Sequence, residues 1–326
     1  MRVLFVLDPL DQLQLETETS LLLAQEFRQR GHETWYAHEG DLWVTDRGVW
    51  VSARELYVES SGTPRAGACT RGRVADFALV LMRQDPPVDA AYRFAAQALE
   101  LAASEVMVVN SPAAVLSWNE KLLPLQFPEY CPPTLVSTRL EEMLDFVRDV
   151  GRAVVKPISE CSGRGIHIVH AGNAAEAIAA TMARYPGEPV VLQRYLPEVV
   201  HGDKRIFLAG PTVVGAVNRI PAGPERLANI HQGARVEATA LSAREEEIAR
   251  VAGDFLCARG IWLAGLDVIG GLLTEVNITS PSALRQINAV TGRRNEVVVV
   301  DVLERLALGE RFSTAPPGRT DTAHTG

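Results

Sequence analysis

The sequence lacks the features of secreted, membrane-spanning and disulfide-built proteins. No run approaches the roughly 18 apolar residues that a membrane-spanning helix needs, and the apolar part of the opening MRVLFVLDPL ends at Asp8, too early for a signal peptide. The four cysteines show neither CxxC pairing nor metal-ligand spacing, so free thiols in a reducing compartment are expected for Cys69, Cys131, Cys161 and Cys257. We therefore expect a cytoplasmic protein that has no membrane partner.

The chain also has fewer positively charged than negatively charged residues. Lys and Arg number 32 against 40 Asp and Glu, which gives a net charge of −8 at pH 7. That balance argues against a nucleic-acid partner, while a local basic groove for phosphates remains compatible with it. With 47% hydrophobic and 22% charged residues, the composition is that of a soluble globular protein. The length of 326 residues favours two or three packed units.

Strand-like and helix-like segments alternate over about the first 115 residues. Short apolar segments typical of buried strands occur at Arg2–Leu7, His32–Ala37, Phe77–Met82 and Glu105–Asn110. Apolar residues at helical spacing predict helices over residues 16–30 and 88–103. This order predicts an α/β unit with an open parallel sheet. Loops at the carboxyl ends of such strands face ligands, and here they are LDPL (7–10) and MRQDPP (82–87).

The remainder of the chain has a different pattern of predicted strands and helices. Short strands are predicted at residues 151–157, 165–170 and 189–196, with a helix at 174–184. A hairpin at 204–220 turns at Gly210-Pro211, a helix spans 242–259, and a last hairpin spans 262–278. Mostly antiparallel strands with interspersed helices predict an α+β unit. The tail, residues 313–326, has no core residues and is expected to be disordered.

The segment LLTEVNI (272–278) is predicted to be a strand, yet it carries polar groups. Successive side chains of a strand point to opposite faces, so Glu275 and Asn277 share one face. The apolar residues that need a core are Leu273, Val276 and Ile278. A three-residue loop at 270–272 would place Asp267 of the preceding strand directly opposite Glu275.

Like charges placed opposite one another destabilise a sheet, so this arrangement favours a hard cation between them. The carboxylates of Asp267 and Glu275 and the amide oxygen of Asn277 suit Mg²⁺, which takes its other ligands from water and phosphates. The alternatives are a solvated acidic face, or a carboxylate paired with an arginine such as Arg285. Because both strands are apolar and should be buried, the metal is the preferred interpretation.

A lysine and a glycine-bearing loop follow the strand that ends at residue 157. Glycines let the backbone approach a ligand and point N–H groups at an anion, and Lys156 at the strand end adds a point charge for a phosphate. Candidate anion contacts are Ser162, Gly163 and Gly165. Neither GxxxxGK[ST] nor a dinucleotide GxGxxG is present. A plain hairpin with a glycine turn is the alternative, and Cys161 and Arg164 are expected to be ordinary surface residues.

Each of these signals is weak alone, but their order is specific. NEK (119–121), KP (156–157) with its loop, QRYLP, GDKR, NRIP and GLDVIG…LTEVNITSPS resemble, in this order, the bacterial glutathione synthetase family of the ATP-grasp superfamily. VLDPL, MRQDPP and VNSP resemble its first domain, and the resemblance extends to about residue 310. It implies a pre-ATP-grasp domain at 1–118 and an ATP-grasp domain at 119–312. The latter would comprise a lid at about 124–195 and a catalytic subdomain at about 196–312.

The resemblance also implies roles for individual residues. ATP phosphates would be contacted by Lys121 and Lys156, with the glycine loop covering them. The nucleotide would lie against Gln193, Tyr195, Leu196 and Asp203. The catalytic cations would be Arg205, Arg219 and Arg285. Substrate contacts would come from Asp8, Arg83, Asn229 and Ser280. Mg²⁺, or Mn²⁺ in its place, would be bound by Asp267, Glu275 and Asn277.

The implied reaction is ATP-driven amide formation through an acyl phosphate, joining γ-glutamylcysteine to glycine in a homo-tetramer or homo-dimer. The sequence departs from the family pattern in SECSGRG (159–165), in RLANIHQGAR (226–235) and at Gln84. These departures leave two alternatives, a related ATP-grasp ligase with other substrates and a non-catalytic nucleotide-binding regulator. The regulator is disfavoured because the metal ligands and both lysines are present.

Overall fold

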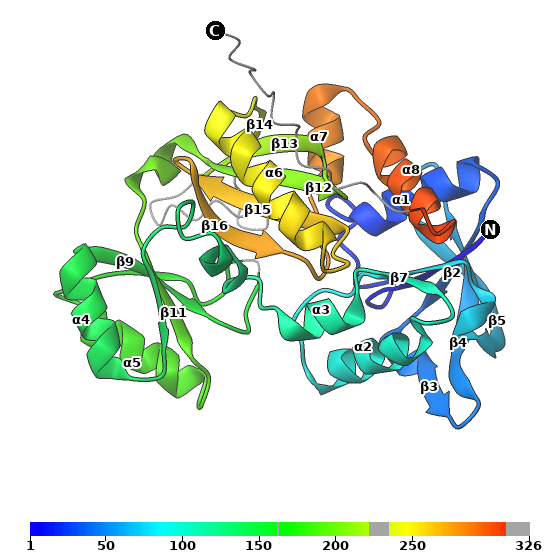
Figure 1. Cartoon of the computed structure of the whole chain (residues 1–326), viewed down its shortest axis with the longest axis horizontal. Coiled ribbons are helices and arrows are strands. Elements are labelled where there is room, and N and C mark those ends of the chain that lie inside the picture. Colours follow the sequence, from blue (N-terminus) through cyan, green and yellow to red (C-terminus); the bar gives the residue numbers. More distant parts are fainter. Residues whose placement is uncertain (162, 222–234, 311–326) are drawn as a thin grey trace, which may run out of the picture.

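The computed structural model describes residues 1–161, 163–221 and 235–310 of the chain. The described residues form three sheets, arranged as a lid sheet at one end of the molecule, a central sheet, and a first sheet at the other end (Figure 1). No helix in these ranges has the length and apolar content that crossing a membrane requires. The tail expected at 313–326 lies outside the described residues.

The first sheet has the predicted parallel strands at its centre. β1 pairs in parallel with β2 and β6, and β6 with β7. These strands are β1 (Arg2–Val6), β2 (Glu33–Ala37), β6 (Leu79–Met82) and β7 (Met107–Val109). Two helices cover its opposite faces: α1 (Thr19–Gln29) packs with Val3 and Phe5, and α2 (Ala90–Ala102) packs with Leu4 and Val6. Alternate residues of β1 therefore serve two cores, as a fully buried strand requires.

The sheet as a whole is mixed, because an antiparallel ribbon that the sequence analysis did not foresee extends it. The ribbon consists of β3 (Leu42–Thr45), β4 (Gly48–Val58) and β5 (Pro64–Arg73), and β4 joins it to β2. Short 3-10 turns, η1 (Glu39–Asp41) and η2 (Val74–Asp76), flank it. β5 is an edge strand with few apolar residues, so it gives no alternating pattern and depends on β4 for its hydrogen bonds.

The lid is a four-stranded antiparallel sheet with two helices on one side. Its strands, in spatial order, are β10 (His167–His170), β9 (Arg152–Pro157), β11 (Val190–Arg194) and β8 (Thr134–Ser137). Its helices are α4 (Leu140–Val150) and α5 (Ala174–Arg184), and the bounds of α5 match the predicted ones. Its buried residues form a separate core, so the lid is a unit that meets the rest of the molecule mainly through loops.

The central sheet is antiparallel, as predicted. Its strands, in spatial order, are β14 (Arg235–Ala238), β13 (Thr212–Ile220), β12 (Asp203–Ala209), β15 (Leu263–Ile269) and β16 (Leu272–Asn277). The β12–β13 hairpin turns at Gly210-Pro211 as expected, and the predicted helix at 242–259 is α6 (Ala243–Cys257), capped by Ser242. The η4 turn (Pro197–His201) connects the lid to β12.

The turn of the last hairpin differs from the prediction, although the register is the predicted one. The loop contains two residues, Gly270 and Gly271, both with positive φ, and not the predicted three. Asp267 still lies opposite Glu275 because β16 bulges at Thr274. The bulge also allows Leu273 and Val276, three positions apart, to enter the same core as Ile278.

Helices at the end of the chain join the central and first sheets. α8 (Glu296–Ala307) shares one core with α1, β1, β12 and α7 (Leu284–Thr291). α3 (Pro112–Ser117) and η3 (Leu123–Gln126) lead from the first sheet to the lid. α8 lies beside α1 in Figure 1, and Arg30 of the α1 C-terminus pairs with Glu304 and Asp301. The first and central sheets are therefore packed together, and the lid stands apart across a cleft.

Candidate active-site cleft

Three neighbouring cavities form one cleft over the central sheet. The central cavity lies between the charged face of that sheet and the loops at 120–121, 157–166 and 279–282. An apolar cavity under the lid shares Ile166, Asp267 and Glu275 with it. An outer cavity, toward the first sheet, shares Asp85 and Ser280. A ligand in the cleft can therefore extend from the lid to the carboxyl ends of the first sheet's strands.

Strand register collects the charges of the central sheet on one face. Asp203 lies opposite Arg219, and Arg205 lies opposite Asp267, which lies opposite Glu275. Because directly opposed residues of antiparallel strands share a face, these five side chains form one charged row. Its members come from β12, β13, β15 and β16, so residues up to 72 positions apart in sequence meet here.

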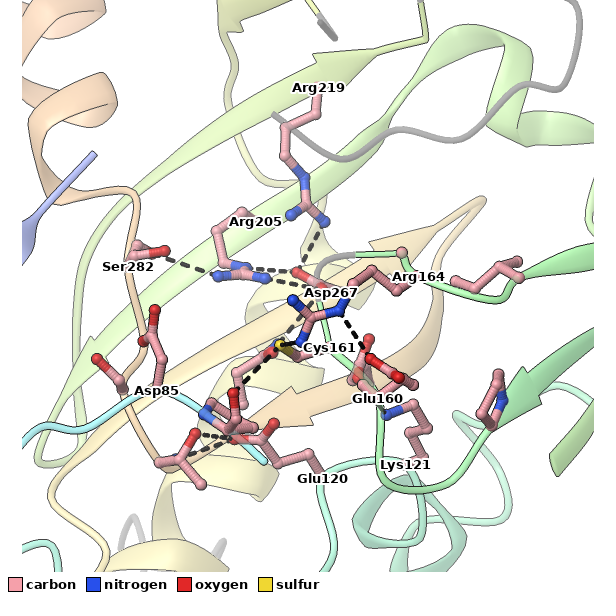
Figure 2. A pocket seen from close by; sticks show the side chains of 18 residues that line it. Asp85, Glu120, Lys121, Glu160, Cys161, Arg164, Arg205, Arg219, Asp267 and Ser282 are labelled. Carbon is pink, nitrogen blue, oxygen red and sulfur yellow. Dashed lines mark hydrogen bonds and ion pairs between the residues drawn. The ribbon is translucent and has the colours of Figure 1, made fainter. Parts of the chain in front are cut away.

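Asp267 is the centre of this row. Arg205 donates from Nε to Asp267 Oδ1 at 2.5 Å and from Nη2 to Oδ2 at 3.0 Å. Arg219 Nη2 lies 2.9 Å from the same Oδ1, and both arginines point at Asp267 in Figure 2. Burial alone would raise the pKa of Asp267, but the two guanidinium groups outweigh burial and hold that pKa well below its usual range.

The approach of Arg205 to Asp267 depends on a glycine. Gly265 precedes Asp267 by two residues on the same face of β15, and the Arg205 side chain lies over it. A Cβ at residue 265 would lie 3.1 Å from Arg205 Cδ. Any larger residue would push the guanidinium away from the carboxylate.

The donor atoms fit a hard divalent cation by type. Two carboxylates, Asp267 and Glu275, face each other, and Asn277 lies one step further along the face. Asn277 Nδ2 donates to Gly265 O at 3.2 Å and to Asp267 Oδ2 at 3.3 Å, which leaves its amide oxygen with no hydrogen-bond partner in the described ranges. Among the described residues no three His, Cys, Asp or Glu side chains form a metal cluster, so the remaining ligands would have to come from a bound phosphate or water.

A carboxylate of the charged face also pairs with arginines, as the alternative interpretation predicts, but the arginines are not Arg285. Arg205 and Arg219 pair with Asp267, while Lys121 Nζ lies 3.7 Å from Glu275 Oε1. The acidic face is therefore neutralised by cations of the chain itself. A metal could use these oxygens only if some of these contacts were exchanged.

The three residues of NEK connect the lid loop to β16. Asn119 Nδ2 donates to Ile158 O at 3.2 Å, and Lys121 Nζ donates to Glu160 O. Glu120 Oε1 accepts bonds from Ile278 N at 2.7 Å, from Thr279 N at 2.9 Å and from Thr279 Oγ1 at 2.9 Å. Glu120 thus holds the chain where it leaves β16, next to Asn277.

The apolar cavity has one polar edge. Its walls include Val154, Ile168, Tyr195, Val199 and Ile269, which form a small apolar cluster. Gln193, Leu196 and Asp203 also line it, as the resemblance implies. An apolar slot with a few polar groups at its rim suits a flat heterocycle.

Two ionisable residues at the polar edge have shifted pKa values. Lys156 Nζ donates to Gln193 Oε1 at 2.9 Å, and burial lowers the pKa of Lys156 although Glu275 opposes this. For Asp203, burial and the neighbouring Asp267 raise the pKa to about 7 against the opposing effect of Arg219. Perturbed groups of this kind beside a cavity are typical of functional sites.

The outer cavity is acidic. It is lined by Asp8, Glu18 and Asp85, together with Ser280. The side chain of Asp85 is exposed at the rim of this cavity, and partial withdrawal from bulk water, together with the charges of Glu18 and Asp8, raises its pKa to about 6. Asp8 Oδ2 accepts a bond from the Asp85 backbone N–H at 2.8 Å. This end of the cleft is suited to a cationic group.

Two of the expected arginines lie behind the cleft wall. Arg83 is buried and donates to Ser20 Oγ at 3.2 Å and to Pro281 O at 2.8 Å, and Arg285 donates to Glu18 O at 2.8 Å. Neither lines the three cavities described here. They hold the loop at 280–283 and the start of α1. The sequence alone could not distinguish this supporting role from a direct ligand contact.

The residues predicted on the segments 159–165 and 226–235 divide into described and undescribed ones. Gly163 lines the central cavity, and Gly165 has φ of 68° and packs against Pro157 and Tyr185. Ser162 and Asn229 lie outside the described residues. Cys161 and Arg164, expected to be ordinary surface residues, line both the central and the outer cavities, and Arg164 Nε donates to Glu160 Oε2 at 2.7 Å (Figure 2).

Several site residues were missed by the sequence reasoning. Glu120 and Glu160 line the central cavity, Asp85 lines the central and outer cavities, and Asn119 bonds the loop beside them. Asn119 and Glu120 adjoin the Lys121 that was chosen, and Asp85 lies within the loop predicted to face a ligand. Adjacency to the Lys121 motif and to the MRQDPP loop is the signal in the sequence that points to these residues.

Models of two protein families match most of the chain. "Prokaryotic glutathione synthetase, N-terminal domain" matches residues 1–115, and "Prokaryotic glutathione synthetase, ATP-grasp domain" matches residues 120–292. Among curated proteins, the glutathione synthetase of Parasynechococcus marenigrum is 38% identical over 308 residues, covering 94% of this chain and 99% of the relative. That of Nitrosomonas europaea is 38% identical over 313 residues, covering 94% and 98%.

Solved structures share the fold at lower identity. D-cycloserine synthetase superposes with a TM-score of 0.66 at 15% identity, covering 94% of this chain and 99% of that one. D-alanyl-alanine synthetase A of Vibrio cholerae gives 0.59 at 15% identity, covering 94% and 98%. These likenesses concern the three-sheet architecture alone.

The first test concerns the anchoring of β16 by Glu120. Truncating the side chain to a methyl group (Glu120→Ala) removes the carboxylate and should increase the hydrogen-exchange rates of the Ile278 and Thr279 amides about tenfold or more, the scale of one charge-assisted hydrogen bond. Glu120→Gln retains an accepting oxygen and should leave most of the protection. Exchange measured by NMR or mass spectrometry decides, and unchanged rates in Glu120→Ala would remove the anchoring role.

The second test uses the raised pKa of Asp85. A carboxyl group whose pKa is higher in the folded than in the unfolded state destabilises the fold when it is ionised. The free energy of unfolding therefore falls as pH rises between the two pKa values, here from about 4 to about 6. Asp85→Asn should therefore have a higher melting temperature than the wild type at pH 8 and an equal one near pH 4. A difference in melting temperature that does not vary between these pH values would contradict the assignment.

Proposed function

The chain belongs to the prokaryotic glutathione synthetase family, and from this we propose that its cleft joins γ-glutamylcysteine to glycine while ATP is cleaved to ADP and phosphate. It is an ATP-dependent carboxylate–amine ligase of the ATP-grasp type. The remaining proposals concern which of its residues perform each part of that reaction.

The charged row beside an apolar slot is the observation that carries this proposal. Asp203, Arg205, Arg219, Asp267 and Glu275 lie between the apolar cavity and the central cavity. A nucleotide with its base in the apolar cavity would place its phosphates on this row. The acceptor of the phosphoryl group would then lie in the central cavity, and the rest of the peptide would extend toward the outer cavity.

We assign the nucleotide contacts to the lid side of the cleft. The base would lie between Tyr195, Leu196 and Val199, with Gln193 and Asp203 at the rim. Lys156 lines the apolar cavity and Lys121 lines the central cavity, and each would meet a phosphate as a point charge. The backbone of the loop that contains Ser162, Gly163 and Gly165 would cover the phosphates, as N–H groups of glycine loops do.

Asp267, Glu275 and Asn277 would hold Mg²⁺, or Mn²⁺ in its place. When bound there, the ion would neutralise charge on the phosphate oxygens. The chain's own cations, Arg205 and Arg219, would stabilise the negative charge that spreads over the transferring phosphoryl group. Both cations are buried, and Arg205 is held by Asp267 and Ser282, so it needs little reorganisation when the charge develops.

Both chemical steps are displacements that need positioning more than covalent help from the protein. A carboxylate oxygen of the dipeptide attacks the γ-phosphorus, and the bond from phosphorus to the oxygen of ADP breaks. The glycine nitrogen then attacks the acyl carbon of the acyl phosphate, phosphate leaves with the bonding pair, and the amine releases a proton. Acyl phosphates hydrolyse readily, so water must be excluded. The loop 159–165 is one closure element, and the loop 221–235, mostly outside the described residues, would be another.

The peptide contacts are proposed for the outer side of the cleft. Asp8 and Asp85 would attract the α-ammonium group of the γ-glutamyl moiety, and Ser280 lies between the central and outer cavities. Arg83 and Arg285 would act by holding the loop at 280–283. Asn229, which lies outside the described residues, would contribute a further substrate contact.

We further propose the division into residues 1–118 and 119–312, with a lid at about 124–195 that closes on the catalytic subdomain at about 196–312. A homo-tetramer or homo-dimer in the cytoplasm is the proposed working form, with no nucleic-acid or membrane partner. No disulfide joins the four cysteines, all of which lie in the described ranges, and this is compatible with a reducing compartment.

Phosphate release with γ-glutamylcysteine and glycine, against a panel of other amines and dipeptides, tests the substrates. The greatest turnover with the named pair is expected. Greater turnover with another pair would favour the alternative of a related ligase, which the altered loops 159–165 and 226–235 leave open.

The same assay tests the metal ligands. Asp267→Asn and Glu275→Gln should each lower turnover at least about a hundredfold, the scale of removing one electrostatic group from a transition state. Glu198→Gln, on the η4 turn outside the charged row, is a control with the same change of charge. Turnover near the wild-type value in either test variant would refute the assignment.

A further inference from the structure

Asp267 has no acceptor site left for a cation. A carboxylate offers about four lone-pair directions. Oδ1 accepts from Arg205 Nε at 2.5 Å and lies 2.9 Å from Arg219 Nη2. Oδ2 accepts from Arg205 Nη2 at 3.0 Å and from Asn277 Nδ2 at 3.3 Å. A metal ion can bind Asp267 only after one of these donors has moved.

Arg205 is the less able of the two arginines to move. Its Nε and Nη2 both bond Asp267, and its Nη1 donates to Ser282 O at 3.3 Å. Its side chain also lies against Gly265. All of its nitrogens therefore have partners, and leaving Asp267 would break two short bonds at once.

Arg219 is held less completely. Its Nη2 is shared between Asp203 Oδ2, at 2.6 Å, and Asp267 Oδ1, at 2.9 Å. Its Nε is buried and has no hydrogen-bond partner among the described residues. An unpaired donor in the interior costs free energy. A position of the guanidinium in which Nε also has a partner would remove that cost.

The missing partner is within reach on the neighbouring strand. Asp203 Oδ1 is likewise buried and has no partner in the described part of the chain. Asp203 and Arg219 are directly opposed on β12 and β13. One unpaired atom is a donor and the other an acceptor, so a side-on pair with bonds Nε–Oδ1 and Nη2–Oδ2 would satisfy both. This two-bond geometry is the preferred one for arginine and a carboxylate.

We propose that Arg219 alternates between two positions and that Asp203 is the positioning residue that controls the exchange. In the position seen here, Arg219 bridges Asp203 and Asp267 and occupies Asp267 Oδ1. In the other, Arg219 pairs side-on with Asp203 alone, and Asp267 Oδ1 is open to a cation. This inference rests on the proposed function, because the cation is the one that accompanies the nucleotide.

The exchange has a consequence for the order of binding. Without nucleotide, Arg219 neutralises Asp267, so a divalent ion alone must displace it and binds weakly. Phosphates add negative charge beside the row and favour both the incoming ion and the movement of Arg219 onto Asp203. The ion and the nucleotide therefore load together, and the acidic face never lacks a counter-charge.

Binding of Mn²⁺ to the full chain, followed by the electron paramagnetic resonance signal of free Mn²⁺, tests this without turnover. In the absence of nucleotide, Arg219→Met should bind Mn²⁺ at least about tenfold more tightly than the wild type, the scale of one charge-assisted hydrogen bond. Lys204→Met is the matched control, because it also removes one positive charge. Lys204 lies between Asp203 and Arg205 on β12, but its side chain points to the other face of the sheet and pairs with Glu245 at 2.7 Å. It should bind Mn²⁺ as the wild type does.

A second set of variants separates the exchange from a simple loss of charge. With saturating ADP, Asp203→Asn should bind Mn²⁺ at least about tenfold more weakly, because Arg219 then stays on Asp267. Adding Arg219→Met to Asp203→Asn should restore tight binding. The double variant removes the pair without changing the net charge, so it also serves if Arg219→Met alone does not fold.

The outcomes distinguish this inference from the proposed function. If Mn²⁺ binding with ADP is the same in the wild type and Asp267→Asn, the metal site is wrong and the exchange falls with it. If Asp267→Asn abolishes that binding but Arg219→Met gains nothing over Lys204→Met, the exchange alone is overturned. Failure of the double variant to recover affinity would likewise overturn it.

Discussion

The ion pairs that Asp267 makes with Arg205 and Arg219 are the constraint on which the site depends. They join β12, β13 and β15 on one face of the central sheet and let that face stay charged while buried. A buried carboxylate without such partners would be strongly destabilising. Because the partners are cations of the chain, the face is stable without a ligand, and it presents both charge signs to the cleft.

The rest of the fold places two different surfaces beside that face. The lid, with its own core, supplies the apolar slot and Lys156, while the first sheet supplies the acidic outer end. The α8 helix fixes the first sheet to the central one through a shared core. The NEK segment connects the lid loop to β16, so Lys121 contacts both walls of the cleft. A displacement of the lid loop would therefore be transmitted to β16 at Glu275.

The sequence predicted the elements that carry strong local patterns. The parallel centre of the first sheet, the bounds of α5 and the opposition of Asp267 and Glu275 are all present. The β3–β5 ribbon was missed because β5 is an exposed edge strand stabilised by pairing, and the bulge at Thr274 is a tertiary adjustment with no local signature. The sequence alone does not show which arginines pair with Asp267, because several arginines lie near strand ends. Only the register between strands determines which of them reach the carboxylate.

A crystal structure of the chain with Mn²⁺ and a non-hydrolysable ATP analogue tests the central claim most directly. We expect an anomalous peak at roughly 2.0–2.4 Å from oxygens of Asp267, Glu275 and Asn277, the range for hard cations and oxygen ligands. The base should lie in the apolar cavity and the phosphates between Lys121 and Lys156. A triphosphate bound elsewhere, or a peak that avoids these three residues, would contradict the account.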